Sequence, residues 1–123
     1  MDLRTPGPAA DDRRLGVDGR DVGPLEWARS GRARRKGLLG RDGIEGGLLL
    51  RASSIHTIGM QFTIDVAFCS DRRGSVEVVA VNTIVPGRVS RPRLGTRLLL
   101  EAEAGSFERW GLVVGSHLEV GPI

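Results

Sequence analysis

The sequence predicts a single small domain that is mostly β. Its 123 residues fall within the usual size of one domain, and a chain of this length can bury a core without a metal or a disulfide. In residues 58–68, apolar side chains alternate with small or polar ones, which is the period of an extended chain with one buried face. Further apolar runs end at glycine-rich turns, a spacing typical of successive strands.

The cysteine and apolar content bears on the cellular compartment. Cys69 is the one cysteine of the sequence, so no intrachain disulfide can form, which suits a reducing compartment. No apolar run approaches the roughly 18 residues of a membrane helix. Residues 1–23 contain no apolar core of a signal peptide. The sequence therefore predicts a cytoplasmic protein without membrane insertion.

The first elements are a tail and a hairpin. Residues 1–12 contain little that can be buried, so we expect a disordered tail ahead of a single β-rich domain at residues 13–123. Asp18-Gly19 is a hairpin turn signal between the apolar residues of two expected strands. Because Pro24 has no N–H to donate, the second strand is predicted to lie at a sheet edge or at a bulge.

A short basic helix is predicted next. Ser30 is a residue type that caps helix N-termini and Gly37 is one that ends helices, so residues 31–36 are expected to be helical. Residues 29–41 hold six cations and no acid, and residues 88–97 hold four cations and no acid. Two such segments could form an anion-binding patch. The alternative is a solvated face, since arginine is abundant along the whole chain, as a genome rich in G and C would produce.

The alternating segment is the most informative of the later elements. Its even-numbered side chains are expected to point into the core, with Gly59 at a bend or bulge. These side chains are Ile58, Met60, Phe62, Ile64, Val66 and Phe68. The run at residues 76–81 is largely apolar, so we expect a central strand that is buried on both faces.

The remaining elements are short. Strands are predicted at residues 48–50 and 118–120, and one helical turn at residues 106–111, with a serine cap and a glycine stop. Residues 98–104 are ambiguous, because leucine, alanine and glutamate favour a helix locally. Seven residues make a short helix, and we interpret this segment as a strand.

Three blocks of the sequence carry a resemblance to a known family. They are Lys-Gly-Leu-Leu-Gly-Arg within residues 32–41, His-Thr-Ile-Gly-Met-Gln-Phe-Thr-Ile-Asp-Val within residues 56–68, and Leu-Glu-Ala-Glu-Ala-Gly followed by Trp-Gly-Leu within residues 100–115. In this order they resemble the small bacterial and archaeal family called domain of unknown function one-nine-two. The resemblance covers residues 13–121. It implies a compact β barrel or sandwich with one or two short helices, and no established activity.

The candidate ligand-binding residues are Arg41, His56 and Asp65. His56 and Asp65 lie in the central block, and an aspartate within an apolar strand has to face solvent or be held by N–H groups or an arginine. The alternative role of Asp65 is structural, fixing a turn or pairing with Arg41. Cys69 lies in an apolar setting and is interpreted as an inert buried thiol. The sequence has no metal-ligand spacing and no phosphate loop, so no metal and no cofactor is predicted.

Two functions of different classes follow. The favoured one is a non-catalytic binding or accessory module for a small ligand or a protein partner. The alternative is a nucleic-acid or polyanion binder. Its candidate residues are Arg34, Arg35, Arg91 and Arg93, in the basic segments 29–41 and 88–97. Nucleic acid is not favoured, because the chain has no tyrosine and most of its two tryptophans and three phenylalanines are expected in the core. A small hydrolase is the third hypothesis.

Overall fold

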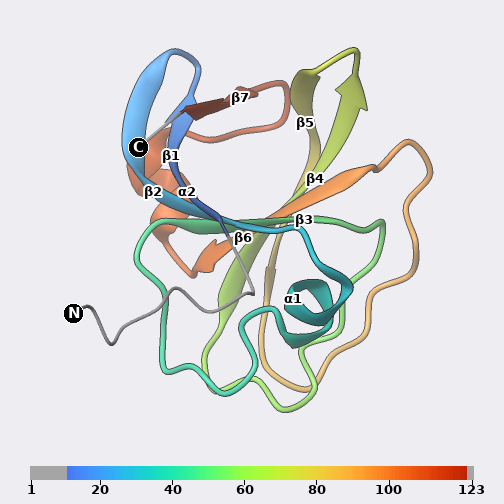
Figure 1. Cartoon of the computed structure of the whole chain (residues 1–123). Helices are drawn as coiled ribbons and strands as arrows, with labels where there is room; N and C mark the ends of the chain where they lie inside the picture. Colours follow the sequence, from blue (N-terminus) through green and yellow to red (C-terminus); the bar gives the residue numbers. More distant parts are fainter. Residues whose placement is uncertain (1–10, 122–123) are drawn as a thin grey trace.

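The computed structural model describes residues 11–121 and forms a closed seven-stranded barrel with two short helices (Figure 1). The predicted mostly β fold class is confirmed, as a barrel and not a sandwich. The elements in chain order are β1 (Asp11–Val17), β2 (Arg20–Ala28), α1 (Gly31–Lys36), β3 (Gly47–Arg51), β4 (Ile64–Arg72), β5 (Ser75–Ile84), β6 (Leu98–Glu103), α2 (Ser106–Trp110) and β7 (His117–Gly121). No helix in this part of the chain is long and apolar enough to cross a membrane.

The strands follow one another around the barrel as β1-β2-β3-β6-β4-β5-β7. Adjacent strands are antiparallel except for β2 and β3, which run parallel and are connected through α1. The contact between β5 and β7 is short, with Val76 paired to Leu118 and Glu77 to His117. The barrel is therefore narrowly closed on the β5 side, and within residues 11–121 most of the β5 edge that faces away from β4 pairs with no strand.

The predicted first hairpin is confirmed. Asp18 and Gly19 form its turn with φ of 50° and 85°, the conformation that Asp-Gly turns favour. Pro24 lies opposite Arg14, beside an irregularity of the β1–β2 register and directly before the residue at which pairing with β3 begins. The expected boundary between tail and domain, at residues 12 and 13, falls inside β1, and residues 1–10 lie outside the described residues.

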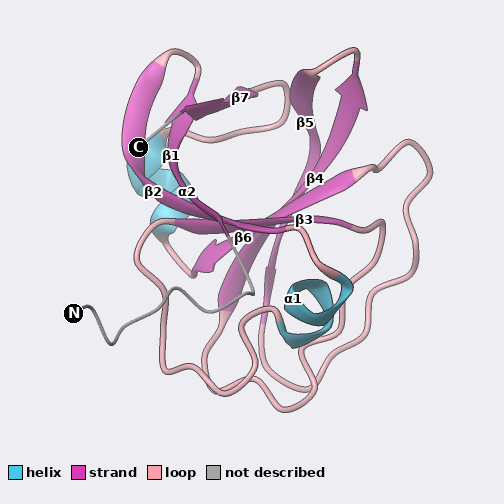
Figure 2. Cartoon of the chain, in the orientation of Figure 1, coloured by secondary structure: helices cyan, strands magenta, loops and turns pink. Residues whose placement is uncertain are grey.

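Two apolar clusters pack on the two faces of the sheet. All seven strands contribute to the inner cluster, which fills the barrel and includes Phe107 and Trp110 of α2. The outer cluster includes Ala33 of α1 and Leu38, which follows it, together with residues of the sheet. Figures 1 and 2 show α1 beside the sheet. Strands β4 and β6 are the most continuously buried strands, since the first six residues of β4 and the first five of β6 are buried.

The prediction of a central strand at residues 76–81 is therefore wrong. This segment belongs to β5, where the side chains of Val79 and Val81 are 39% and 38% exposed. The helices pack against β2 and β6 instead, and the short pairing with β7 leaves β5 partly uncovered. An apolar run shows that a strand can be buried, but the elements that cover it are set by the tertiary structure.

The alternating segment is a strand only in its second half. β4 begins at Ile64, whereas Ile58 is 56% exposed and Phe62 is only partly buried, so the inward orientation predicted for Ile58 is wrong. The reason is Thr57, whose buried hydroxyl donates to the Val85 carbonyl and accepts from the Arg88 N–H. These bonds tie the chain to the turn after β5, and Gly59, with φ of 84°, reverses its direction as expected for a bend.

Candidate functional site

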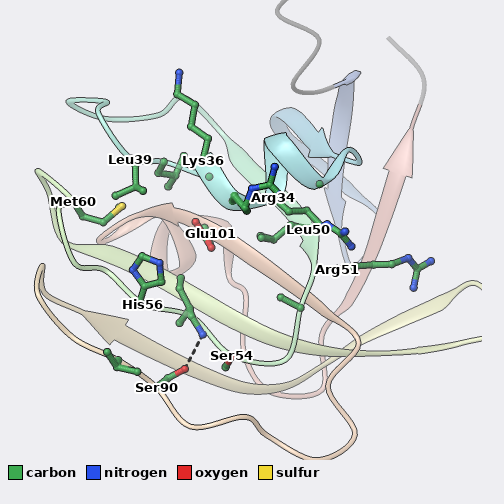
Figure 3. Close-up of a pocket in the computed structure, with 17 residues that line it drawn as sticks. Arg34, Lys36, Leu39, Leu50, Arg51, Ser54, His56, Met60, Ser90 and Glu101 are labelled. Atoms are coloured by element: carbon green, nitrogen blue, oxygen red, sulfur yellow. Dashed lines mark hydrogen bonds between the residues drawn. The ribbon is translucent and has the colours of Figure 1, made fainter.

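A hollow lies between α1 and the loops after β3 and β5 (Figure 3). Its volume is about 340 Å³, within the usual size of small-molecule sites. Apolar side chains form the walls, among them Leu39, Leu50, Ile55, Met60 and Val89. Four cations border it, Arg34, Arg35, Lys36 and Arg51. We call this hollow the α1 pocket.

The local sequence sets the position of α1 over the sheet. The Ser30 side chain accepts a hydrogen bond from the Ala33 N–H at 3.0 Å, as predicted for an N-cap. Gly37 ends the helix with φ of 48°, a conformation that favours glycine. Because Ala33 is buried against the sheet, Arg34 and Arg35 are placed at the mouth of the pocket, and Figure 3 shows Lys36 and Arg51 extending outward.

Glu101 lies at the inner end of the α1 pocket. It is on β6, paired with Leu48 on one side and Val66 on the other, so its side chain points to the outer, α1-covered face. The residue is only 4% exposed. A methyl group added at Gly37 would lie 3.9 Å from Glu101 Oε1, so this carboxylate sits directly beneath the end of α1. No group in residues 11–121 forms a hydrogen bond or ion pair with it.

Burial dominates the electrostatics of Glu101. It raises the pKa of the carboxyl group to about 7, and the charge of Arg41 partly opposes this rise. Arg41 is itself held by Glu26, through Nη1–Oε2 and Nη2–Oε1 contacts of 2.7 and 2.9 Å. Near neutral pH, Glu101 can therefore be a hydrogen-bond donor when protonated or an anionic acceptor when ionised.

The structure does not bring the three predicted ligand residues together. His56 is exposed and lines the α1 pocket. Arg41 is outside that pocket, in its ion pair with Glu26, and affects the pocket only through its charge. Asp65 points to the opposite face of the sheet, where it pairs across strands with Ala102 of the inner cluster.

Asp65 caps α2. Its Oδ2 accepts hydrogen bonds from the N–H groups of Gly105 and Phe107 at 3.0 and 3.1 Å, and its Oδ1 accepts from the Thr83 hydroxyl at 2.9 Å. The expected serine cap is wrong, since Ser106 lies inside α2 and Gly105 precedes it without a side-chain cap. Of the structural roles considered for Asp65, it fixes a turn and does not pair with Arg41.

The candidate polyanion residues are divided by the structure. Arg34 and Arg35 border the α1 pocket, whereas Arg91 and Arg93 are exposed outside it. The Arg93 guanidinium lies 5.2 Å from the centroid of the Phe68 ring. The two basic segments nevertheless approach each other, because Val89, at the start of the second one, lines the pocket opposite α1.

Other potentially reactive groups lie away from the pocket. Cys69 is buried in the inner cluster, and burial raises the pKa of its thiol to about 12, so the thiolate is scarce at neutral pH. His117 lies 3.7 Å from Glu77 on the barrel surface. Within the described part of the chain, no group of three or more His, Cys, Asp or Glu side chains could hold a metal ion.

Sequence reasoning missed Glu101. The signal was an acid within the apolar run of residues 98–102, where a strand buried on both faces leaves no solvent for a charge. The same reasoning had drawn attention to Asp65, which also interrupts an apolar strand. The local pattern cannot say which of the two acids finds partners, because the partners of Asp65 come from β5 and from the start of α2, which are distant in sequence.

Comparison with known proteins supports the architecture. The sequence profile of the family DUF192, described as Uncharacterized ACR, matches residues 14–120. A solved protein from Sinorhizobium meliloti 1021, described as a proposed transcription regulator, is 20% identical with a TM-score of 0.77, covering 91% of this chain and 95% of its own. A protein of unknown function from Novosphingobium aromaticivorans DSM 12444 is 22% identical with a TM-score of 0.72, covering 94% and 89%. No curated protein matches.

Proposed function

The chain belongs to the DUF192 family, whose function is unknown, and we propose that it is a non-catalytic module that binds a small anionic ligand with an apolar body in the α1 pocket. One observation carries the proposal. Arg34 and Arg35 stand at the mouth of a hollow with apolar walls, and Glu101, a buried carboxylate with no hydrogen-bond or ion-pair partner in residues 11–121, lies at its inner end.

The composition of the pocket fits such a ligand. Binding sites for small molecules combine apolar walls with a few convergent polar groups that fix orientation. Here the walls come from the α1 loop, β3 and the loop after it, and arginine at the mouth suits a carboxylate or a phosphate. Of the residues predicted from sequence, His56 lies at this pocket, and Arg41 acts on it through Glu101.

A binding role accounts for the groups better than a hydrolase does. Asp65 has both oxygens engaged by α2 and Thr83, and Cys69 is a buried, protonated thiol. Neither is available as a nucleophile or a general base. The single free and buried cysteine suits a reducing compartment, so we place this binding activity in the cytoplasm.

Titration with straight-chain carboxylates from butyrate to octanoate, followed by two-dimensional amide NMR, tests the proposal. We expect saturable chemical-shift changes at the amides of Leu39, Ile55 and Met60. The double variant Arg34→Gln with Arg35→Gln should lower the affinity about tenfold or more, since each lost charge-assisted contact costs about 1 kcal/mol or more. The matched control is Arg32→Gln with Arg72→Gln, which removes the same charge at exposed positions outside the pocket. Equal weakening in both variants, or no saturable shifts, would contradict the proposal.

Polyanion binding is a second candidate, favoured by the approach of the basic segments 29–41 and 88–97 across the pocket. A similar solved protein carries a description as a proposed transcription regulator. If nucleic acid is the ligand, its affinity should fall with salt by a logarithmic slope of about −0.9 per duplex phosphate contacted. Replacing Arg91 and Arg93 by glutamine should then reduce that slope, while leaving carboxylate binding in the α1 pocket unchanged.

A further inference from the structure

Resting on the proposed function, we infer that the ligand of the α1 pocket is a small zwitterion. Its acidic group stays with Arg34 and Arg35 at the mouth, an apolar spacer crosses the walls, and a protonated amine reaches the carboxylate of Glu101. The juxtaposition that carries this inference is an unpartnered buried acid at one end of an apolar hollow and a group of cations at the other.

The inner end of the pocket requires a hydrogen-bond donor. Glu101 faces Leu48 of β3 and Val66 of β4, with the end of α1 above it. The one cation that acts on it electrostatically, Arg41, is engaged by Glu26. The Glu101 oxygens are not fully enclosed and accept no hydrogen bond from residues 11–121, so a donor on a ligand in the pocket would supply the missing hydrogen bond. An ammonium is the strongest such donor, because it also neutralises the charge.

The mouth of the pocket excludes a simple amine. Arg34, Arg35, Lys36 and Arg51 all border it, so a ligand with a net positive charge would be repelled as it entered. A ligand that carries an acid on its outer end has an attractive partner at the mouth and arrives without net charge. Between the two ends, Leu39, Leu50 and Ile55 form an apolar wall, which favours a spacer of methylene groups along it. Ser54, His56 and Ser90 are the polar residues that also line the pocket.

The zwitterion can be tested with matched ligand pairs. Straight-chain ω-amino carboxylates, from β-alanine to aminooctanoate, are each compared with the carboxylate of the same length that lacks the amine. Calorimetry above pH 7 keeps Glu101 ionised, given its pKa of about 7. At the best spacer length, the amino carboxylate should bind at least about tenfold more tightly, the factor expected for one charge-assisted hydrogen bond.

Variants assign this preference to Glu101. Glu101→Gln should reduce the preference for the amino carboxylate to near parity and leave the affinity for the simple carboxylate within about twofold, since the anion contacts at the mouth are unchanged. Glu103→Gln is the control, because this acid is on the same strand but lines a different hollow. It should keep the full preference.

The possible failures are distinguishable. The inference of a zwitterionic ligand is wrong if the natural protein binds both members of a pair equally. It is also wrong if Glu101→Gln keeps the preference for the amino carboxylate, or if this variant binds neither ligand. In each of these cases, carboxylate binding at the mouth is judged by its own test. If no carboxylate binds with or without an amine, and the Arg34 and Arg35 variants change nothing, the proposed function fails as well. The inference is supported if the natural protein and the Glu103→Gln variant both bind the amino carboxylate more tightly than the simple carboxylate, and the Glu101→Gln variant does not.

Discussion

Two buried carboxylates on adjacent strands divide the molecule into two regions. Asp65 on β4 and Glu101 on β6 are 5% and 4% exposed, and the register places them one residue apart across the strand pair. They point to opposite faces, so Asp65 lies on the side of the inner cluster and α2, and Glu101 lies on the side of α1. Asp65 accepts three hydrogen bonds, whereas Glu101 accepts none from residues 11–121.

The difference separates a structural acid from an available one. The N–H groups at the start of a helix need acceptors, and Asp65 supplies them for α2 where the preceding Gly105 has no side chain. Glu101 stabilises nothing comparable, and its burial is unfavourable for the ionised protein. A buried acid that does not contribute to the fold, and that borders a hollow with cations at its mouth, is better explained by a ligand than by folding.

The largest effect is expected from Asp65. Asp65→Ala leaves the N–H groups of Gly105 and Phe107 without acceptors, so we expect a loss of about 3 kcal/mol or more in the free energy of unfolding, since hydrogen bonds to charged groups contribute about 1.5 to 3 kcal/mol each. Asp65→Asn should lose less, because one amide oxygen remains as an acceptor. Urea melts measure both, and hydrogen exchange at Gly105 and Phe107 should accelerate in Asp65→Ala.

A control removes an acid from an exposed position. Glu77→Ala, on the surface of β5, should change the free energy of unfolding by no more than about 0.5 kcal/mol. If Asp65→Ala costs no more than Glu77→Ala, then Asp65 does not hold α2, and the contrast with Glu101 disappears.

Loss of the Glu101 carboxylate should stabilise the protein near neutral pH, whereas loss of the Asp65 carboxylate should destabilise it. Its pKa is about 7 in the folded protein, above the ordinary value of 4.5, so the folded state binds more protons than the unfolded state between these values. Stability should therefore fall as pH rises through this window and level off above it. Ionising Glu101 in the folded protein therefore costs about 3 kcal/mol more than in the unfolded chain, since a tenfold change in a proton-binding constant corresponds to about 1.4 kcal/mol.

Glu101→Gln isolates this contribution. The variant should lack this part of the pH dependence and be more stable than the natural protein above pH 7, by up to about 3 kcal/mol. Below the ordinary glutamate pKa, where Glu101 is protonated in both states, the two proteins should differ little. Urea melts of both proteins at several pH values measure the difference, and a Glu101→Gln protein that is less stable at high pH would show that the carboxylate has a structural partner.

Much of the fold could be predicted where the signal was local. Asp18-Gly19 requires only its own backbone to form a turn, and Ser30 needs only a nearby N–H to cap α1. The alternation before Ile64 misled because the same pattern occurs in a loop that Thr57 ties to residues distant in sequence. The burial of β5 depends on which helix covers which strand, and this arrangement cannot be predicted from the local sequence of β5.

The candidate site was harder to predict for the same reason. The central block contributes His56 to the pocket, but Asp65 points to the opposite face of the sheet. The side chains of β4 alternate between the two faces, so the face of Asp65 is set by the register of β4 and not by its closeness to His56 in sequence. Arg34 and Arg35 were associated with a polyanion surface, and only the packing of α1 over β6 places them above an acid. Glu101 could be recognised as anomalous from sequence, but not as unpartnered.

The smallest expected effect concerns Arg41, whose charge acts on Glu101 from outside the α1 pocket. Its positive charge lowers the pKa of Glu101, and it is held in place by a two-pronged contact with Glu26. Arg41→Gln should therefore raise the pKa of Glu101 further, both because a cation is lost and because Glu26 is left as an uncompensated anion. The side-chain carboxyl carbon of Glu101, followed by NMR during a pH titration, measures this shift directly.

In the double variant Glu26→Gln with Arg41→Gln the second cause is absent, so the rise in the pKa of Glu101 should be smaller but in the same direction. Arg51→Gln removes an exposed cation that borders the same pocket, and should leave the pKa of Glu101 near its natural value, because solvent screens an exposed charge. Were Arg51→Gln to shift the pKa as much as Arg41→Gln, the carboxylate would be responding to the cations of the mouth and not to Arg41.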